Sequence, residues 1–314
     1  MAVEATVEPA GAAPRGRRPR RHAHVGATAA LLSGPLLWTI VFFVVPVVLV
    51  AMYSVGFVTL LRDDQYNTLA FWRLFFSSSV YLNTPFSEGL FWRSVRMSLG
   101  VSVTCVLLSY PVAYMLALVA GRRKYTLLLV IIAPFLTSYL LRVLAWRVLL
   151  NPNGVIQTFL RDPRVGVLHE GQNIAWLYNS TFAIYFVLAY VWVPFVALPI
   201  FVALESLDLH LLEASTDLGA SRWTTFRRVT LPLSMPGVIA AFVFVFIPTL
   251  GEYITPQLVG GPGGHMFGNA IQASFAESFD WQFGSAMSMF LIFAVAILLA
   301  IFGRYLNVRS VAAG

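Results

Sequence analysis

The side chains best placed for chemistry gather in a polar stretch, residues 205–232, between two long apolar segments. Its small, charged and turn-forming residues come in the order Glu213, Ala214, Ser215, Gly219, Leu231 and Pro232. We find no constellation of nucleophile, base and metal ligand of the kind that catalysis needs. A charged side chain flanked by small and apolar ones instead suits contact with another protein. The stretch therefore predicts a docking surface.

A second group of candidate residues combines carboxylates with aromatic rings near an outer loop. Glu252 and Tyr253 precede the loop 256–282, which has no lysine or arginine, and Asp280 and Trp281 close it. Carboxylates and ring faces attract cations, so these four residues are candidates for a cation path. Two alternatives remain open: Glu252 as a carboxylate exposed to water at the membrane interface, and Trp281 as part of an aromatic belt.

Residues for other kinds of chemistry are missing from the sequence. Cys105 is the only cysteine, and the five histidines are scattered without metal-ligand spacing. The only lysine, Lys124, lies outside the Gly-x-x-x-x-Gly-Lys-Ser/Thr frame of a phosphate-binding loop. We therefore expect no metal site, no catalytic residue and no cofactor in this chain, which disfavours a membrane-embedded enzyme.

The composition indicates that these candidates sit in a membrane protein. Hydrophobic residues make up 58% of the chain and charged residues 11%, against about 25% charged in soluble proteins. A bilayer core needs about 20 apolar helical residues. The segments that meet this length predict an all-α membrane protein with six transmembrane helices: Leu31–Phe57, Met97–Ala120, Thr126–Leu150, Thr181–Leu204, Leu233–Thr255 and Phe283–Leu306.

The distribution of basic residues predicts the orientation of these helices. Arginines cluster before the first span, beside Lys124 and in the stretch 205–232, whereas the last outer loop has none. Both termini and the stretch 205–232 are then cytoplasmic. We expect a disordered basic tail at 1–28, a transmembrane domain at 29–306 and a cytoplasmic tail at 307–314. We expect the helices to be surrounded by membrane lipid, and we do not expect the chain to bind nucleic acid.

The docking stretch itself predicts two short helices. Asp208 suits an N-cap for the first helix, Gly219 can end it with a positive φ, and Ser221 can cap the second. The second helix runs through Trp223 and Phe226, which we expect to anchor a partner protein. An interfacial loop whose arginines meet lipid headgroups is the alternative. A further short amphipathic helix is expected over residues 268–279.

The spacing in this stretch closely resembles the EAA loop of ABC-importer permeases. That loop has Glu-Ala-Ala, three residues, Gly, nine residues, Ile, any residue and Leu-Pro; only Ser215 and Val229 depart from it here. The resemblance implies a permease fold of the type I importers. It also implies ATP and magnesium on a separate ATPase dimer, and coupling to that dimer through Glu213, Ala214, Gly219, Trp223, Phe226, Leu231 and Pro232.

Further motifs, spread over most of residues 30–306, resemble the B-type permeases for spermidine and putrescine. They are Pro134 to Ser138 with Arg142, Gly251 to Pro256, and Asp280 to Gly284. The resemblance implies polyamine import across a bacterial cytoplasmic membrane, with a second homologous permease and an extracytoplasmic substrate-binding protein. Permeases for iron, sulfate, thiamine or opines share the loop and remain alternatives. An ion-coupled secondary transporter is a third possibility, but the predicted spans offer it no central ionisable residues.

Overall fold

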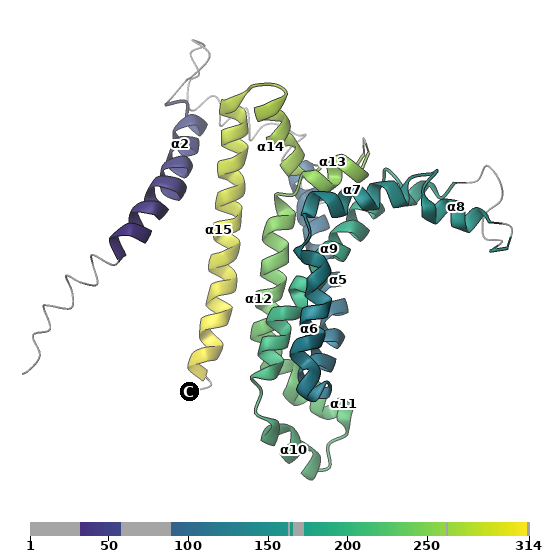
Figure 1. Ribbon diagram of the computed structural model, residues 1–314. Helices are drawn as coiled ribbons and strands as arrows, with labels where there is room; N and C mark the ends of the chain where they lie inside the picture. Colours follow the sequence, from purple (N-terminus) through teal and green to yellow (C-terminus); the bar gives the residue numbers. More distant parts are fainter. Residues whose placement is uncertain (1–31, 58–88, 163, 166–172, 262, 313–314) are drawn as a thin grey trace, which may run out of the picture. The chain divides into compact units, whose positions relative to one another are not determined.

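The computed structural model of the chain describes residues 32–57, 89–162, 164–165, 173–261 and 263–312, with side chains as far as residue 303 (Figure 1). Every regular element in these ranges is a helix. The predicted tail at 1–28 lies outside the described residues. The all-α prediction is confirmed for the part of the chain that is described.

The first predicted span is a helix of 23 residues, Leu32–Ser54. It includes a π-helical turn, η1 (Ile40–Val44), and continues as α2 (Val45–Ser54). The turn comes directly before Pro46, which has no backbone N–H to offer an α-helical bond. Most of its apolar side chains are exposed, as expected for a helix surrounded by lipid.

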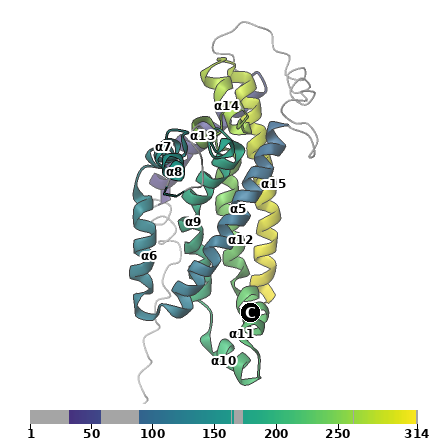
Figure 2. The same cartoon turned by 90° about the vertical axis from the view of Figure 1, so that its right-hand side faces the viewer.

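Three long helices pack against one another and form the main core: α5 (Leu90–Tyr114), α9 (Thr181–Glu205) and α12 (Leu231–Leu250). Both views show them running alongside one another (Figures 1 and 2). Small and branched side chains fill the contact, among them Val101, Cys105, Val187 and Val245. Ser109 of α5 donates a hydrogen bond of 2.7 Å to the carbonyl of Val193. Small polar residues of this kind let membrane helices approach closely.

The contact between α9 and α12 depends on Gly237. A Cβ added there would lie 2.3 Å from the Cβ of Ala203 and 2.8 Å from the carbonyl oxygen of Pro199. Real Cβ atoms do not approach other atoms so closely, so only glycine fits without moving a helix. These two helices are therefore held in tight contact at this level.

The third predicted span, Thr126–Leu150, is not one straight helix. It consists of α6 (Lys124–Ile132), the 3₁₀ turn η4 (Ala133–Leu136) and α7 (Tyr139–Leu150), with a bend of 79°. The chain becomes extended at Thr137 (ψ 160°), after Pro134 has removed one backbone donor. By length and composition the described residues contain five spanning helices, or six if this bent pair counts as one span. The span predicted over Thr126–Leu150 is therefore present as a bent pair of helices that breaks after Pro134.

The fifth span also differs from the prediction, because it begins before Pro232. The helix is continuous over Arg222–Leu250 and comprises α11 (Arg222–Thr225), the π-helical turn η6 (Phe226–Thr230) and α12. The N–H of Leu231 bonds to the carbonyl of Phe226, one residue further back than in an α-helix. This wider turn accommodates the proline that the sequence suggested as a boundary. The helix ends at Leu250, not at the predicted Thr255.

The end of the bundle opposite α10 carries two short helices and the start of the last span (Figure 1). They are α13 (Ile254–Val259), α14 (Phe267–Ala276) and α15 (Trp281–Ala312). The amphipathic helix expected at 268–279 is confirmed as α14. Its first residue, Phe267, donates its N–H to Ser94 of α5 at 2.7 Å. The last span continues past its predicted end, so residues 307–312 are helical.

Candidate coupling surface and substrate path

The docking stretch forms a helical hairpin at one end of the bundle, where Figure 2 shows α10 (Leu209–Asp217) below α11. Asp208 caps α10 by accepting the N–H of His210 at 3.0 Å. Ser221 caps α11 by accepting the N–H of Thr224 at 3.2 Å. Gly219, between the two helices, has φ 79°. These three local predictions are confirmed.

A partly buried hydrogen bond joins the two helices of the hairpin. The hydroxyl oxygens of Ser215 and Thr225 are 2.8 Å apart, and Thr225 is only 8% exposed. Ser215 stands where the permease motif has its third small residue. A hydroxyl at this position therefore adds a bond that alanine could not make.

One face of the hairpin is open to a partner protein. Leu218 is 88% exposed, and Leu211, Glu213, Ala214 and Gly219 are also exposed. Leu211 and Leu218 thus offer apolar side chains that a partner protein could cover. The motif residues Glu213, Ala214 and Gly219 all belong to this face.

The remaining predicted coupling residues lie on the helix that continues into the membrane. Phe226 contacts Tyr110 and Tyr114 of α5 edge-to-face, with ring centroids 5.7 and 6.1 Å apart. Trp223 stacks on Phe226 at 5.4 Å. Leu231 is half-buried, and Pro232 is exposed in the first turn of α12. Phe226 therefore links the hairpin to α5, a contact that the sequence alone did not predict.

A cluster at the start of the hairpin was also missed. The ammonium of Lys124, at the start of α6, lies 2.7 Å from the Glu205 carboxylate that ends α9. The Tyr125 hydroxyl donates to the same carboxylate oxygen at 2.5 Å. The sequence did contain a signal: Glu205 is an isolated acid at the end of an apolar span, and Lys124 is the only lysine of the chain. We had interpreted Lys124 only as a sign of helix orientation. This cluster ties α6 to α9 directly before the hairpin.

At the opposite end, Glu252 and Tyr253 lie in the break between α12 and α13. The Glu252 carboxylate accepts the N–H of Thr255 at 3.0 Å, and the Thr255 hydroxyl lies 2.6 Å from that of Tyr139. The backbone carbonyl of Tyr253 accepts a bond from Asn269 at 2.9 Å. Glu252 is half-buried and Tyr253 is 41% exposed. Glu252 thus has a structural role at the start of α13, and part of it remains accessible.

Asp280 and Trp281 do not join Glu252 in one site. Asp280 caps α15 by accepting the N–H of Phe283 at 3.1 Å, and Trp281 packs edge-to-face on Phe275 near the end of α14. The beginning of α14 instead packs on Glu252, because Gly268 lies against the carbonyls of residues 251 and 252. The ten residues of α14 span about 15 Å, so the two pairs lie at opposite ends of this helix.

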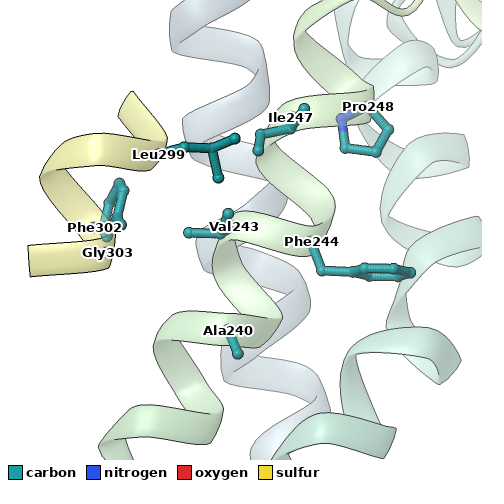
Figure 3. Close-up of a pocket in the computed structure, with 8 residues that line it drawn as sticks. All are labelled: Ala240, Val243, Phe244, Ile247, Pro248, Leu299, Phe302 and Gly303. Atoms are coloured by element: carbon teal, nitrogen blue, oxygen red, sulfur yellow. The ribbon is translucent and has the colours of Figure 1, made fainter. Parts of the chain in front are cut away.

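A cleft of about 490 Å³ lies between α12 and α15 and is shown in Figure 3. Its eight lining residues run from Ala240 to Pro248 on α12 and from Leu299 to Gly303 on α15, and none has a polar side chain. Such a surface cannot replace the hydration of a cation. In the part of the chain that the structure describes, no group of three His, Cys, Asp or Glu side chains could hold a metal ion either.

Comparison with known proteins identifies this arrangement. Residues 35–312 match the family described as binding-protein-dependent transport system inner membrane component. The chain belongs to this family. The permease is thus a multi-pass transport subunit of the bacterial inner membrane and not an enzyme. Such a subunit works with other components of its transport system.

Two relatives of the permease are similar along most of their length. PotB of Haemophilus influenzae, a spermidine/putrescine transport system permease protein, is 35% identical over 267 residues, which are 85% of this chain and 90% of PotB. PotB of Escherichia coli K12 is 32% identical over 269 residues, 85% of this chain and 93% of that protein. They confirm the resemblance to ABC-importer permeases.

A solved structure shows the same fold in a distant relative. The bacterial ABC transporter involved in the import of the acidic polysaccharide alginate matches with a TM-score of 0.68 at 16% identity, covering 91% of this chain and 96% of that one. At this identity the likeness concerns the fold alone. It agrees with the permease fold predicted from the loop.

Proposed function

We propose that this permease imports polyamines such as putrescine and spermidine in an ATP-driven system. The observation that carries the proposal is the 35% identity to a spermidine/putrescine permease along 85% of the chain. The loop between α12 and α15 supports it, because it combines the carboxylates of Glu252 and Asp280 with the rings of Tyr253 and Trp281 and has no lysine or arginine.

In this proposal the permease contacts an ATPase dimer, a second permease and a binding protein. The exposed face of the hairpin, with Glu213, Ala214 and Gly219, contacts an ATPase dimer in the cytoplasm. Trp223, Phe226, Leu231 and Pro232 pass the movement of the hairpin to α5 and α12. A second homologous permease completes the path, and an extracytoplasmic binding protein delivers the substrate near Glu252, Tyr253, Asp280 and Trp281. ATP and magnesium are bound by the ATPase.

Uptake in cells that lack their own polyamine importers tests the proposal. The permease is expressed with an ATPase, a second permease and a binding protein from its own organism, and the accumulation of labelled spermidine and putrescine is measured. Cells with a hydrolysis-deficient ATPase serve as the control. We expect ATP-dependent accumulation that unlabelled polyamine competes away.

Two other outcomes would contradict the proposal. Competition by iron, sulfate, thiamine or an opine, without effect of polyamine, would reassign the substrate while leaving the importer class intact. Uptake by the purified permease alone, driven by an ion gradient without ATP, would establish a secondary transporter.

A further inference from the structure

A second apolar groove, which we name the Arg222 groove, lies between α5 and the helix Arg222–Leu250. Its volume is about 610 Å³, and its walls include Val106, Leu107, Tyr114, Trp223 and Val238, with Arg222 at the hairpin end. It differs from the cleft in Figure 3 in having one permanent positive charge and the polar-edged rings of tyrosine and tryptophan in an otherwise apolar lining.

The charge in this groove has no partner within the chain as described. Ion pairs among the described residues join Lys124 to Glu205 and His210 to Glu213, and neither involves Arg222. Arg222 is exposed, and so are Arg227 and Arg228 on the same helix, which do not line the groove. An anionic group bound at Arg222 would therefore meet an unopposed guanidinium, which offers paired donors suited to a phosphate.

The apolar part of the groove has the dimensions of one membrane leaflet. From Val106 to Tyr114, α5 rises about 12 Å, close to the half-thickness of about 15 Å of a bilayer core. Tyr114 and Trp223 lie at the charged end, where amphipathic rings meet lipid headgroups. Leu107, toward the other end, is 68% exposed and so accessible from the hydrocarbon.

From these features we infer that the Arg222 groove binds an anionic phospholipid, with its phosphate at Arg222 and an acyl chain along α5. Because Phe226 forms part of the groove and contacts Tyr110 and Tyr114, the lipid packs against the joint between the hairpin and α5. The ATPase-binding face that we propose, with Glu213, Ala214 and Gly219, does not include the residues that line this groove. The permease would then be sensitive to the anionic lipid content of its membrane.

Lipid retention by the purified full-length chain tests this site. Native mass spectrometry compares phosphatidylglycerol with phosphatidylcholine of identical acyl chains, using the wild type and Arg222→Gln. We expect the wild type to retain phosphatidylglycerol preferentially and the variant to bind it about five-fold more weakly, the value of one interfacial arginine. Arg228→Gln removes the same charge outside the groove and should leave the preference unchanged.

A second variant tests the apolar part of the site. Leu107→Trp fills the groove from the exposed side of α5 and should reduce retention of both lipids. Equal retention of both lipids by the wild type would overturn the inference. An equal loss of phosphatidylglycerol binding in Arg228→Gln and Arg222→Gln would also overturn it, because it would indicate attraction to the basic helix as a whole and not to the groove. A photoreactive side chain at position 107 that links to another protein in the assembled transporter would show that a permease partner fills the groove, and would also overturn it.

Discussion

The Glu252 side chain combines two properties that mutation can separate. Its oxygen accepts the Thr255 N–H, and its negative charge remains partly accessible. Glu252→Gln keeps an acceptor oxygen and removes the charge. We therefore expect an intact fold and a KM for spermidine uptake about five-fold higher, since a partly exposed charge contact contributes about 1 kcal/mol.

The matched control for Glu252 is Glu277→Gln. Glu277 is an exposed carboxylate of the same region, at the other end of α14, and should affect uptake little. Uptake kinetics in whole cells measure both variants. Unchanged kinetics in Glu252→Gln would remove this residue from the substrate path and leave only its capping role.

Gly219 offers a test of the hairpin turn at a position with no steric crowding. Its φ is 79°, and no atom lies within 4 Å of where a Cβ would be, so strain there comes from the backbone alone. Gly219→Val should cost about 1–2 kcal/mol in this left-handed conformation and abolish ATP-driven uptake while the protein still inserts. Asn tolerates the conformation, so Gly219→Asn should retain uptake. Equal uptake in the two variants would show that transport does not depend on the left-handed backbone conformation at Gly219.

Among the helices, α10 and α11 are joined by one partly buried hydrogen bond. Thr225→Val keeps the shape of the side chain and leaves the Ser215 hydroxyl without its partner. We expect a loss of about 1 kcal/mol in the stability of the hairpin, seen as faster hydrogen exchange over residues 209–220. Thr216→Val is the control, because the Thr216 hydroxyl bonds only to the Glu213 carbonyl of its own helix. Equal exchange rates in both variants would refute the bond's role.

The sequence predicted most helices because their signals are local. Caps at Asp208 and Ser221 and the turn at Gly219 depend on neighbouring residues, and apolar length identified the spans. Proline does not by itself say whether a helix breaks or continues, and the boundary predicted at Pro232 was wrong for that reason. At Pro134 the helix breaks. Pro232 also lacks a backbone N–H, but a π-helical turn precedes it and the helix continues.

The parts of the site that were missed depend on contacts between distant segments. Neither the packing of Phe226 on α5 nor the contact of Lys124 with Glu205 follows from spacing, because each joins helices whose relative positions the sequence does not encode locally. The separation of Glu252 from Asp280 likewise depends on how α14 lies between them. Sequence identified these candidate residues, and only the fold shows which of them meet.

For the whole molecule, the charge distribution predicts that both termini face the cytoplasm, and the single buried cysteine allows a direct test. In a Cys105→Ala background, one cysteine is placed at Leu218 or at Glu277, both of which are exposed. A membrane-impermeant maleimide added to spheroplasts should label position 277 and not position 218. Lysed membranes provide the control, since both positions should then react. The opposite pattern in spheroplasts would reverse the orientation.

The unbroken helix Arg222–Leu250 has a mechanical consequence for the permease. Its 29 residues measure about 42 Å from end to end, and no loop interrupts them between the hairpin and the break at Gly251. We therefore expect a displacement of the hairpin at Arg222 to be transmitted along this helix to the segment that holds Glu252. Because Gly237 packs tightly against α9, we expect a movement of this helix to carry α9 with it toward the end of the bundle that holds Glu252.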